Sequence, residues 1–199
     1  MKGYYFITDS ALSRAGNLPD VRSALKAGVE VVQYREKNKT NREIYKEACL
    51  LRKICRDITF LVNDRIDIAL SAGADGVHLG SEDLPYAVAR KMLGKSKIIG
   101  LTAHTLKEAI EAQKIGADYI GVSPIFATST KLDAGEPAGP ELIAKIKERI
   151  SIPIVAIGGI NLLNAAKVIR AGADGLCAIS AVITKPDVRR EIKKFQGLF

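Results

Sequence analysis

A polar segment in the middle of the chain has residue types suited to bind an oxyanion. Residues 128–131 read Thr-Ser-Thr-Lys and follow the mostly apolar residues 121–126. Three hydroxyls and one ammonium donate hydrogen bonds, and the ammonium adds positive charge. The same residue types are common in exposed turns, so the segment taken alone is also compatible with a surface loop. Residues that follow other apolar stretches of the chain help to decide between an anion-binding segment and a surface loop.

Gln33, Arg35 and Lys37 alternate along the chain directly after an apolar stretch. Alternate side chains of an extended strand share a face, so these three are expected to point to one side. Two cations and an amide on one side suit a polyanion such as a diphosphate. Surface charge is the alternative, and it accounts better for Glu36 and Lys39 than for Arg35.

Two carboxylates follow the next two apolar stretches. Asn63 and Asp64 come after residues 59–62, and Asp83 comes shortly after residues 76–79. Mg²⁺ takes one or two protein carboxylates and completes its shell with phosphate oxygens and water, so the pair beside the cations favours a Mg²⁺ site. Helix N-capping is the alternative for each carboxylate.

Glycines and small polar residues end the last two apolar stretches. Gly158 and Gly159 follow residues 154–157, and Ile179 and Ser180 end the stretch that begins at residue 175. In an eight-stranded α/β barrel, this is where backbone N–H groups bind a phosphate. A tight turn is the alternative for the glycine pair.

Thr102 and two histidines complete the candidate set. His104 follows the stretch that contains Thr102, and it is interpreted either as a general base or as the start of the next helix. His78 lies inside the fourth apolar stretch, where we expect a histidine that faces the core or supports a neighbouring residue.

Eight short apolar or β-branched stretches are separated by helical patterns, which predicts alternating strands and helices. The expected helices include 41–54, 105–115, 140–149 and 163–171, with Asn41 and Thr105 as N-caps and Pro140 as a first helical residue. The expected strands are residues 4–8, 29–34, 59–62, 76–79, 98–101, 119–122, 154–157 and 175–179.

A short recurrent motif joins helix ends to strands in four places, and it reads Gly-Ala-Asp in three copies and Gly-Val-Glu in the other. Its glycines, Gly28, Gly73, Gly116 and Gly172, fit helix C′ positions with positive φ and lie two βα units apart. A regular βα repeat with eight strands predicts a single-domain (β/α)8 TIM barrel of class α/β over residues 1–199. A doubly wound open sheet is the alternative, although no Gly-x-Gly-x-x-Gly follows the first strand. In a barrel, the strand ends discussed above meet at one mouth.

The composition and charge of the chain limit the classes of ligand that it is expected to bind. The chain has 199 residues, 47% hydrophobic, and a formal net charge of +8. Its basic residues are dispersed over predicted helices, so a small phosphorylated ligand is favoured over nucleic acid. No apolar stretch approaches the roughly 20 residues of a membrane helix, and the N-terminus reads as a strand, so no membrane association and a cytoplasmic location are expected. The three cysteines lack metal-ligand spacing and are expected to be structural thiols.

The ordered set of segments resembles the thiamine phosphate synthase (thiamine-phosphate pyrophosphorylase) family over nearly the whole chain. Single segments are weak signals, whereas the ordered set is highly specific. The matching segments are residues 33–37, 63–64, 80–83, 102–105, 124–131, 156–160 and 178–181.

The resemblance implies an enzyme that joins 4-amino-2-methyl-5-hydroxymethylpyrimidine diphosphate to 4-methyl-5-(2-hydroxyethyl)thiazole phosphate, giving thiamine phosphate and diphosphate. It implies a dissociative mechanism in which Mg²⁺ assists diphosphate loss before the thiazole nitrogen attacks. The implied roles are diphosphate binding by Arg35, Lys37 and Lys131, Mg²⁺ binding by Asp64 and Asp83, pyrimidine contacts by Gln33, Asn63 and Thr102, and thiazole phosphate binding near Thr128, Thr130, Gly158, Gly159, Ile179 and Ser180.

Three residues depart from the family pattern. Thr102 stands where serine is usual, Ala127 where proline is usual, and Ser123 where glycine is common.

Other functions are also compatible with the sequence. A thiazole tautomerase-like barrel would use His104 for proton transfer but typically lacks the Mg²⁺ carboxylates. A non-catalytic barrel that binds a phosphorylated ligand also fits the pattern, as does an unrelated phosphate-binding isomerase. The sequence does not indicate an oligomeric state.

Overall fold

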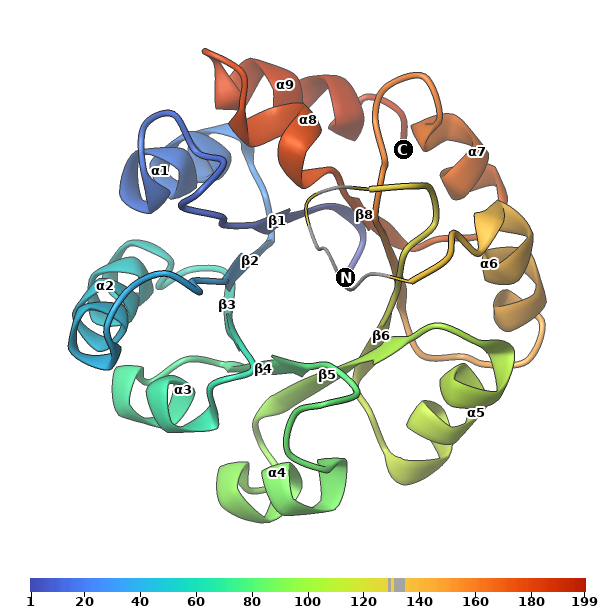
Figure 1. The fold of residues 1–199 in the computed structure, drawn as a ribbon, viewed down its shortest axis with the longest axis horizontal. Coiled ribbons are helices and arrows are strands. Elements are labelled where there is room, and N and C mark those ends of the chain that lie inside the picture. The colour runs from blue at the N-terminus through green and yellow to red at the C-terminus, as the bar shows by residue number, and fades with distance from the viewer. Residues whose placement is uncertain (129, 131–134) are drawn as a thin grey trace.

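In residues 1–128, 130 and 135–199, which the computed structural model describes, eight parallel strands close into a barrel with the strands in chain order (Figure 1). β1 pairs with both β2 and β8, which closes the ring and rules out the open sheet. The (β/α)8 barrel is therefore confirmed. The strands are β1 (Gly3–Ile7), β2 (Val31–Tyr34), β3 (Thr59–Asn63), β4 (Gly76–Leu79), β5 (Ile98–Ala103), β6 (Tyr119–Val122), β7 (Ile154–Ile157) and β8 (Gly175–Cys177).

Helices surround the barrel, as Figure 1 shows in the view down its axis. Among the described residues, none of these helices is long and apolar enough to cross a membrane. The helices are α1 (Asn17–Ala27), α2 (Asn41–Ile54), α3 (Ile66–Ala72), α4 (Tyr86–Leu93), α5 (Leu106–Ile115), α6 (Gly139–Lys147), α7 (Ala165–Arg170), α8 (Ile179–Ile183) and α9 (Val188–Gln196).

Most element boundaries follow local capping chemistry. Thr105 caps α5 as predicted, since its side chain accepts the N–H of Glu108 at 3.2 Å. The predicted cap Asn41 is wrong by one residue, because Thr40 and Glu43 form a reciprocal capping box at the start of α2. The last strand is shorter than predicted. It ends at Cys177, and Ile179 is already the first residue of α8.

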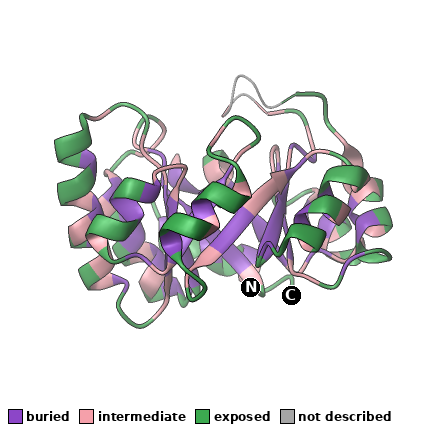
Figure 2. Ribbon diagram, turned by 90° about the horizontal axis from the view of Figure 1, so that it is seen from below, coloured by how far each residue is buried: buried purple, intermediate pink, exposed green. Residues whose placement is uncertain are grey.

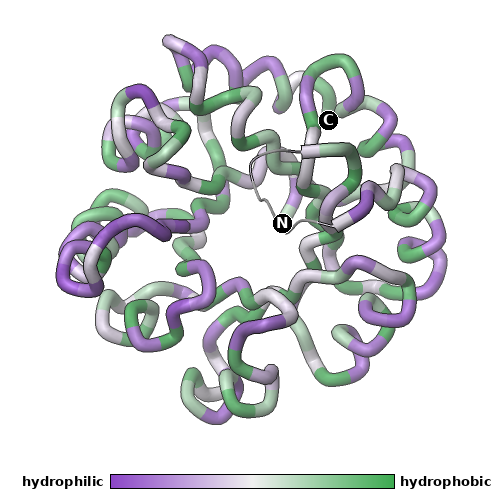
Figure 3. The backbone as a smooth tube through the Cα atoms, viewed as in Figure 1, coloured by the Kyte–Doolittle hydropathy of each residue, from purple (hydrophilic) through white to green (hydrophobic). Residues whose placement is uncertain are grey.

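The core has two layers. One lies inside the barrel and includes Tyr5, Leu61, Tyr119 and Val155, and the other fills the space between the strands and the helices. The strands are buried while the outer helix faces are exposed (Figure 2), and polar residues gather on the outer helices and loops (Figure 3). Strands covered on both sides are buried on both faces, which explains why they read as continuous apolar stretches.

The recurrent motif has a structural role at the amino-terminal end of the barrel. Its four glycines have φ between 69° and 101°, as predicted. In three copies, the aspartate before an even strand accepts a backbone N–H from the preceding odd strand and pairs with a helix cation. The contacts are Asp75 with Phe60 and Arg52, Asp118 with Ile99 and Arg90, and Asp174 with Ile154 and Lys147. This contact ties strands together in pairs and explains the spacing of two βα units.

Candidate active site

A cavity of about 300 Å³ opens at the carboxyl-terminal ends of the strands. It brings together every described residue that the sequence singled out for binding. Lys131 lies outside the described residues. The predicted residues that line the cavity are Gln33, Arg35, Lys37, Asn63, Asp64, Asp83, Thr102, Thr128, Thr130, Gly158, Gly159, Ile179 and Ser180.

Arg35 is held at the mouth by the end of β1. Its guanidinium donates to the Asp9 carboxylate at 2.8 Å, and Asp9 is largely buried. The Thr8 hydroxyl donates to the carbonyl of Arg35 and accepts its N–H, both at 2.9 Å. Sequence reasoning missed Asp9 and Thr8, although Thr8 ends the first predicted strand and Asp9 follows it, so both belong to the same rim.

Lys37 and the two carboxylates form a compact charged group. The Lys37 ammonium pairs with Asp64, and Asp83 accepts the N–H of Gly80 at 2.6 Å. Burial raises the pKa of Asp83, and the neighbouring Asp64 carboxyl raises it further, while Lys37 opposes this effect. Two carboxylates that destabilise each other's charge make a site that favours a cation.

The helix-capping alternative for these carboxylates is wrong. The N-cap of α3 is Arg65 and that of α4 is Pro85, and neither helix has a side-chain cap. Asp64 instead has a φ of 61°, in the left-handed region. Such backbone is uncommon outside glycine and occurs often at functional sites.

The carboxylate pair fits a Mg²⁺ ion by its chemistry. Within the described ranges, no group of three or more His, Cys, Asp or Glu side chains gathers to form a metal site. Asp64 and Asp83 both line the cavity, where a substrate can supply further oxygen ligands. Two carboxylates with open positions are the donor set that Mg²⁺ uses beside phosphates.

The glycine pair after β7 is required by a close backbone approach. Gly158 and Gly159 have φ values of 98° and 63°. A Cβ on Gly159 would lie 2.4 Å from the carbonyl oxygen of Ala127, and one on Gly158 would lie 2.8 Å from Cα of Pro124. The pair therefore packs against the loop that carries Thr128. Ser180 enters the same side of the cavity from the first turn of α8.

Comparison with known proteins identifies the family. A family model described as thiamine monophosphate synthase matches residues 4–182. The chain belongs to this family. A thiamine-phosphate synthase of Methanosarcina barkeri is 53% identical over 193 residues, covering 96% of this chain and 88% of that protein. The corresponding enzyme of Chloroflexus aurantiacus is 47% identical, covering 98% and 91%.

A solved structure of a thiamine phosphate pyrophosphorylase from Pyrococcus furiosus agrees in fold as well as sequence. Its TM-score is 0.91 with 43% identity, and the match covers 99% of this chain and 94% of that one. A 3-hexulose-6-phosphate synthase at 18% identity and a TM-score of 0.70 shares the fold alone. The family and its close relatives assign this chain to the transferases of thiamine biosynthesis.

His104 lies directly before the N-cap of α5, outside the helix. Its Nδ1 contacts the carbonyl oxygen of Ser123. A carbonyl only accepts, so Nδ1 carries the proton and Nε2 is left as an acceptor in a residue that lines the cavity. His78 is buried as predicted, and it contacts Tyr119 and Thr102.

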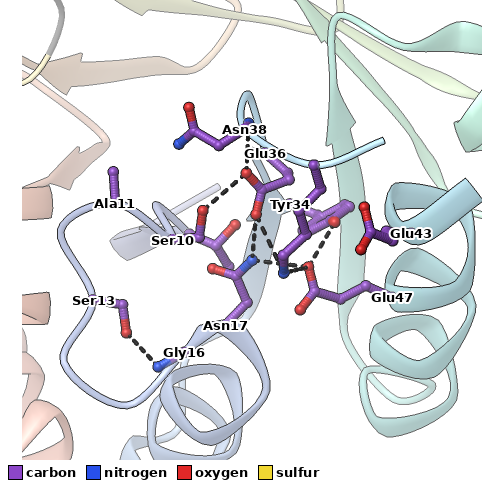
Figure 4. A network of polar contacts seen from close by, with 12 residues as sticks. Ser10, Ala11, Ser13, Gly16, Asn17, Tyr34, Glu36, Asn38, Glu43 and Glu47 are labelled. Carbon is purple, nitrogen blue, oxygen red and sulfur yellow. Dashed lines mark hydrogen bonds and ion pairs between the residues drawn. The ribbon is translucent and has the colours of Figure 1, made fainter. Parts of the chain in front are cut away.

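The segment after β2 is fixed by a cluster of polar side chains, shown in Figure 4. Glu36 accepts from Ser10 at 2.8 Å and from Asn17 at 3.2 Å. Although burial opposes its ionisation, the Asn38 N–H, the Ser10 hydroxyl and the Lys39 ammonium together lower the pKa of Glu36. Its side chain is fully buried, so its interpretation as surface charge is wrong.

Lys39 belongs to the same cluster and is also more than a surface charge. Its ammonium lies 2.7 Å from Glu47 of α2 and 3.4 Å from Glu36. The Tyr34 hydroxyl donates to the same Glu47 carboxylate at 2.7 Å. The cluster therefore anchors both ends of the segment that presents Arg35 and Lys37 to the cavity.

Proposed function

We propose that the chain condenses 4-amino-2-methyl-5-hydroxymethylpyrimidine diphosphate with 4-methyl-5-(2-hydroxyethyl)thiazole phosphate, giving thiamine phosphate and diphosphate. The observation that carries the proposal is the composition of one cavity. It holds two cations and the three carboxylates of Asp64, Glu82 and Asp83 on one side, and a glycine pair with a small hydroxyl residue on the other. Two anion sites in one mouth suit the joining of a diphosphate-bearing to a monophosphate-bearing substrate.

Arg35 and Lys37 would bind the diphosphate, together with Lys131. Arg35 is oriented by Asp9, while Lys37 is half exposed and can turn from Asp64 to a phosphate oxygen. Cations at a leaving diphosphate stabilise the charge that develops as the carbon–oxygen bond breaks. No general base is needed for this step, because the charge that must be stabilised is that of the departing diphosphate.

Asp64 and Asp83 would hold Mg²⁺. When bound, Mg²⁺ would supply charge neutralisation for the departing diphosphate. Without the metal, the same carboxylates would repel the diphosphate. Release of the Asp64–Lys37 ion pair would give each group its new partner at the same time.

The remaining cavity residues would bind the rings and the thiazole phosphate. Gln33, Asn63 and Thr102 would contact the pyrimidine. Phosphate binding would use backbone groups of Gly158, Gly159 and Ile179 with the hydroxyls of Thr128, Thr130 and Ser180. Residues 1–199 would act as one catalytic domain. The cytoplasmic location stays a prediction.

Formation of thiamine phosphate, followed by mass spectrometry, tests this function. We expect product only when the pyrimidine diphosphate, the thiazole phosphate and Mg²⁺ are all present, and at least about 100-fold less with Arg35→Ala. Absence of product from the complete mixture would contradict the proposal. Isomerisation of the thiazole phosphate that is lost in His104→Gln would instead support the tautomerase-like alternative, because His104 offers an acceptor nitrogen to the cavity.

A further inference from the structure

A continuous chain of hydrogen bonds crosses the barrel from β2 to β5, and every link except the part-buried one to Thr102 is buried. Its two ends and His78 line the cavity, whereas Tyr5 and Tyr119 do not. The links are Gln33 Nε2 to Tyr5 Oη at 2.9 Å, Tyr5 Oη to Tyr119 Oη at 2.7 Å, Tyr119 Oη to His78 Nδ1 at 2.9 Å, and His78 Nε2 to Thr102 Oγ1 at 3.0 Å. We refer to these five residues as the relay.

Two glycines inside the barrel make room for the relay. A Cβ on Gly100 would lie 2.1 Å from Cζ of Tyr119, and a Cβ on Gly121 would lie 3.0 Å from Cε1 of His78. Glycine inside a strand weakens it and often marks a close approach. The strands β5 and β6 therefore contain glycines where the rings of the relay need space.

One proton order uses every link of the relay when the Gln33 nitrogen donates to Tyr5. In that order, Tyr5 donates its single proton to Tyr119, and Tyr119 donates its proton to Nδ1 of His78. A neutral histidine that accepts at Nδ1 carries its proton on Nε2, which donates to Thr102. Burial raises the pKa of both tyrosines above their usual value, which keeps both hydroxyls protonated.

The two ends of the relay therefore depend on each other. In this order, the Thr102 hydroxyl accepts a hydrogen bond from His78 and can donate its own proton to a ligand, while Oε1 of Gln33 can accept a hydrogen bond from the ligand. If every proton in the relay pointed the other way, Gln33 would offer an N–H to the ligand and Thr102 could only accept a hydrogen bond from it. Changing one end alone would leave an unpaired buried donor or acceptor, which is costly.

We propose that the relay selects a heteroaromatic ring that presents an acceptor to Thr102 and an adjacent donor to Gln33. A 4-aminopyrimidine offers this pair as a ring nitrogen beside an exocyclic amino group. Tyr5 and Tyr119 are then positioning residues that act on the ring through Gln33 and Thr102. The identity of the ring rests on the proposed function, whereas the coupling of the two ends rests on the hydrogen bonds themselves.

Tyr119→Phe tests the coupling because it keeps the ring and removes one link. Binding of the 4-amino pyrimidine diphosphate and of its 4-oxo analogue is measured by calorimetry in the wild type and the variant. The wild type is expected to prefer the amino ligand. In the variant, Gln33 and Thr102 reorient independently, so the ratio of the two affinities is expected to fall at least about tenfold.

A matched variant separates this effect from general destabilisation. Tyr4→Phe also removes a buried hydroxyl, which donates to the Ala178 carbonyl oxygen at 3.1 Å outside the relay, and it should keep the wild-type ratio. If Tyr119→Phe does not fold, Tyr5→Phe breaks the neighbouring link.

The outcomes distinguish the relay from the proposed function. A folded relay variant with an unchanged ratio overturns the relay and leaves the proposed function intact. A wild-type protein that binds neither pyrimidine overturns the proposed function and the ring assignment together. A ratio that falls equally in Tyr4→Phe also overturns the relay, because the effect would then belong to any buried hydroxyl.

Discussion

Lys37 and Asp64 form an ion pair across the loops that follow β2 and β3. In the proposed function these residues bind different partners, since Lys37 binds diphosphate and Asp64 binds Mg²⁺. On that proposal, the pair would open when substrate and metal bind. Lys37 is 52% exposed, so its pairing contributes little stability and its release costs little.

Asp64→Asn is expected to lower Mg²⁺-dependent turnover by at least about 100-fold, because a neutral amide is a weaker ligand and leaves Lys37 without its partner. Steady-state kinetics over a Mg²⁺ titration measure the effect. Asp67→Asn, which removes an exposed carboxylate of α3, is the control and should retain activity. Wild-type turnover in Asp64→Asn would contradict the metal assignment.

Asp9→Asn is expected to raise KM for the pyrimidine diphosphate about tenfold, since Arg35 loses the charged partner that fixes its guanidinium. KM for the thiazole phosphate should change much less, because its proposed site lies by β7 and β8. Asp57→Asn removes an exposed carboxylate paired with Arg56 and serves as the control. Equal changes in both KM values would argue against a local role for Asp9.

Glu36→Gln is expected to destabilise the protein in a pH-dependent way. The pKa of Glu36 is lowered by folding, so its charge contributes stability above the unfolded value of about 4.3, and this contribution is lost as pH falls through the folded pKa. Urea unfolding at several pH values should therefore show the wild type and variant converging below about pH 4. A difference that stays constant or grows on acidification would contradict the assignment.

Gly159→Ala is expected to weaken thiazole phosphate binding, because a Cβ would lie 2.4 Å from the Ala127 carbonyl oxygen. Gly73→Ala is a matched control. Gly73 has a similar φ of 69°, but nothing lies within 4 Å of its Cβ position. Both variants carry backbone strain of about 1 kcal/mol, yet only Gly159→Ala should lower phosphate affinity in calorimetry. Equal affinities for phosphate would show that the close approach is unimportant for the site.

The sequence predicted the barrel because its signals are local. Short apolar stretches alternate with helical patterns, and Gly28, Gly73, Gly116 and Gly172 mark the helix ends with positive φ. Closure of the barrel then places all strand ends at one mouth, so residues that follow seven of the strands could be grouped without knowing any contact. Boundaries were less certain, since Thr40 and not Asn41 caps α2, and β8 ends before Ile179.

The parts of the site that escaped sequence reasoning depend on distant contacts. Asp9 supports Arg35 from another strand, and Glu36 is buried by Ser10 and Asn17, which belong to segments far from it in the chain. Tyr5 and Tyr119 read as core residues, because their hydroxyls meet only after the barrel closes. Such pairings have no signal in a single sequence.

In the proposed function, one cavity holds a diphosphate site with Mg²⁺ and a separate phosphate site. The decisive measurement of this claim is the release of diphosphate from the pyrimidine diphosphate, with each component omitted in turn. We predict rapid release only when the thiazole phosphate and Mg²⁺ are both present. No release from the complete mixture, while the thiazole phosphate still binds, would contradict the claim and leave a barrel that binds a single phosphorylated ligand.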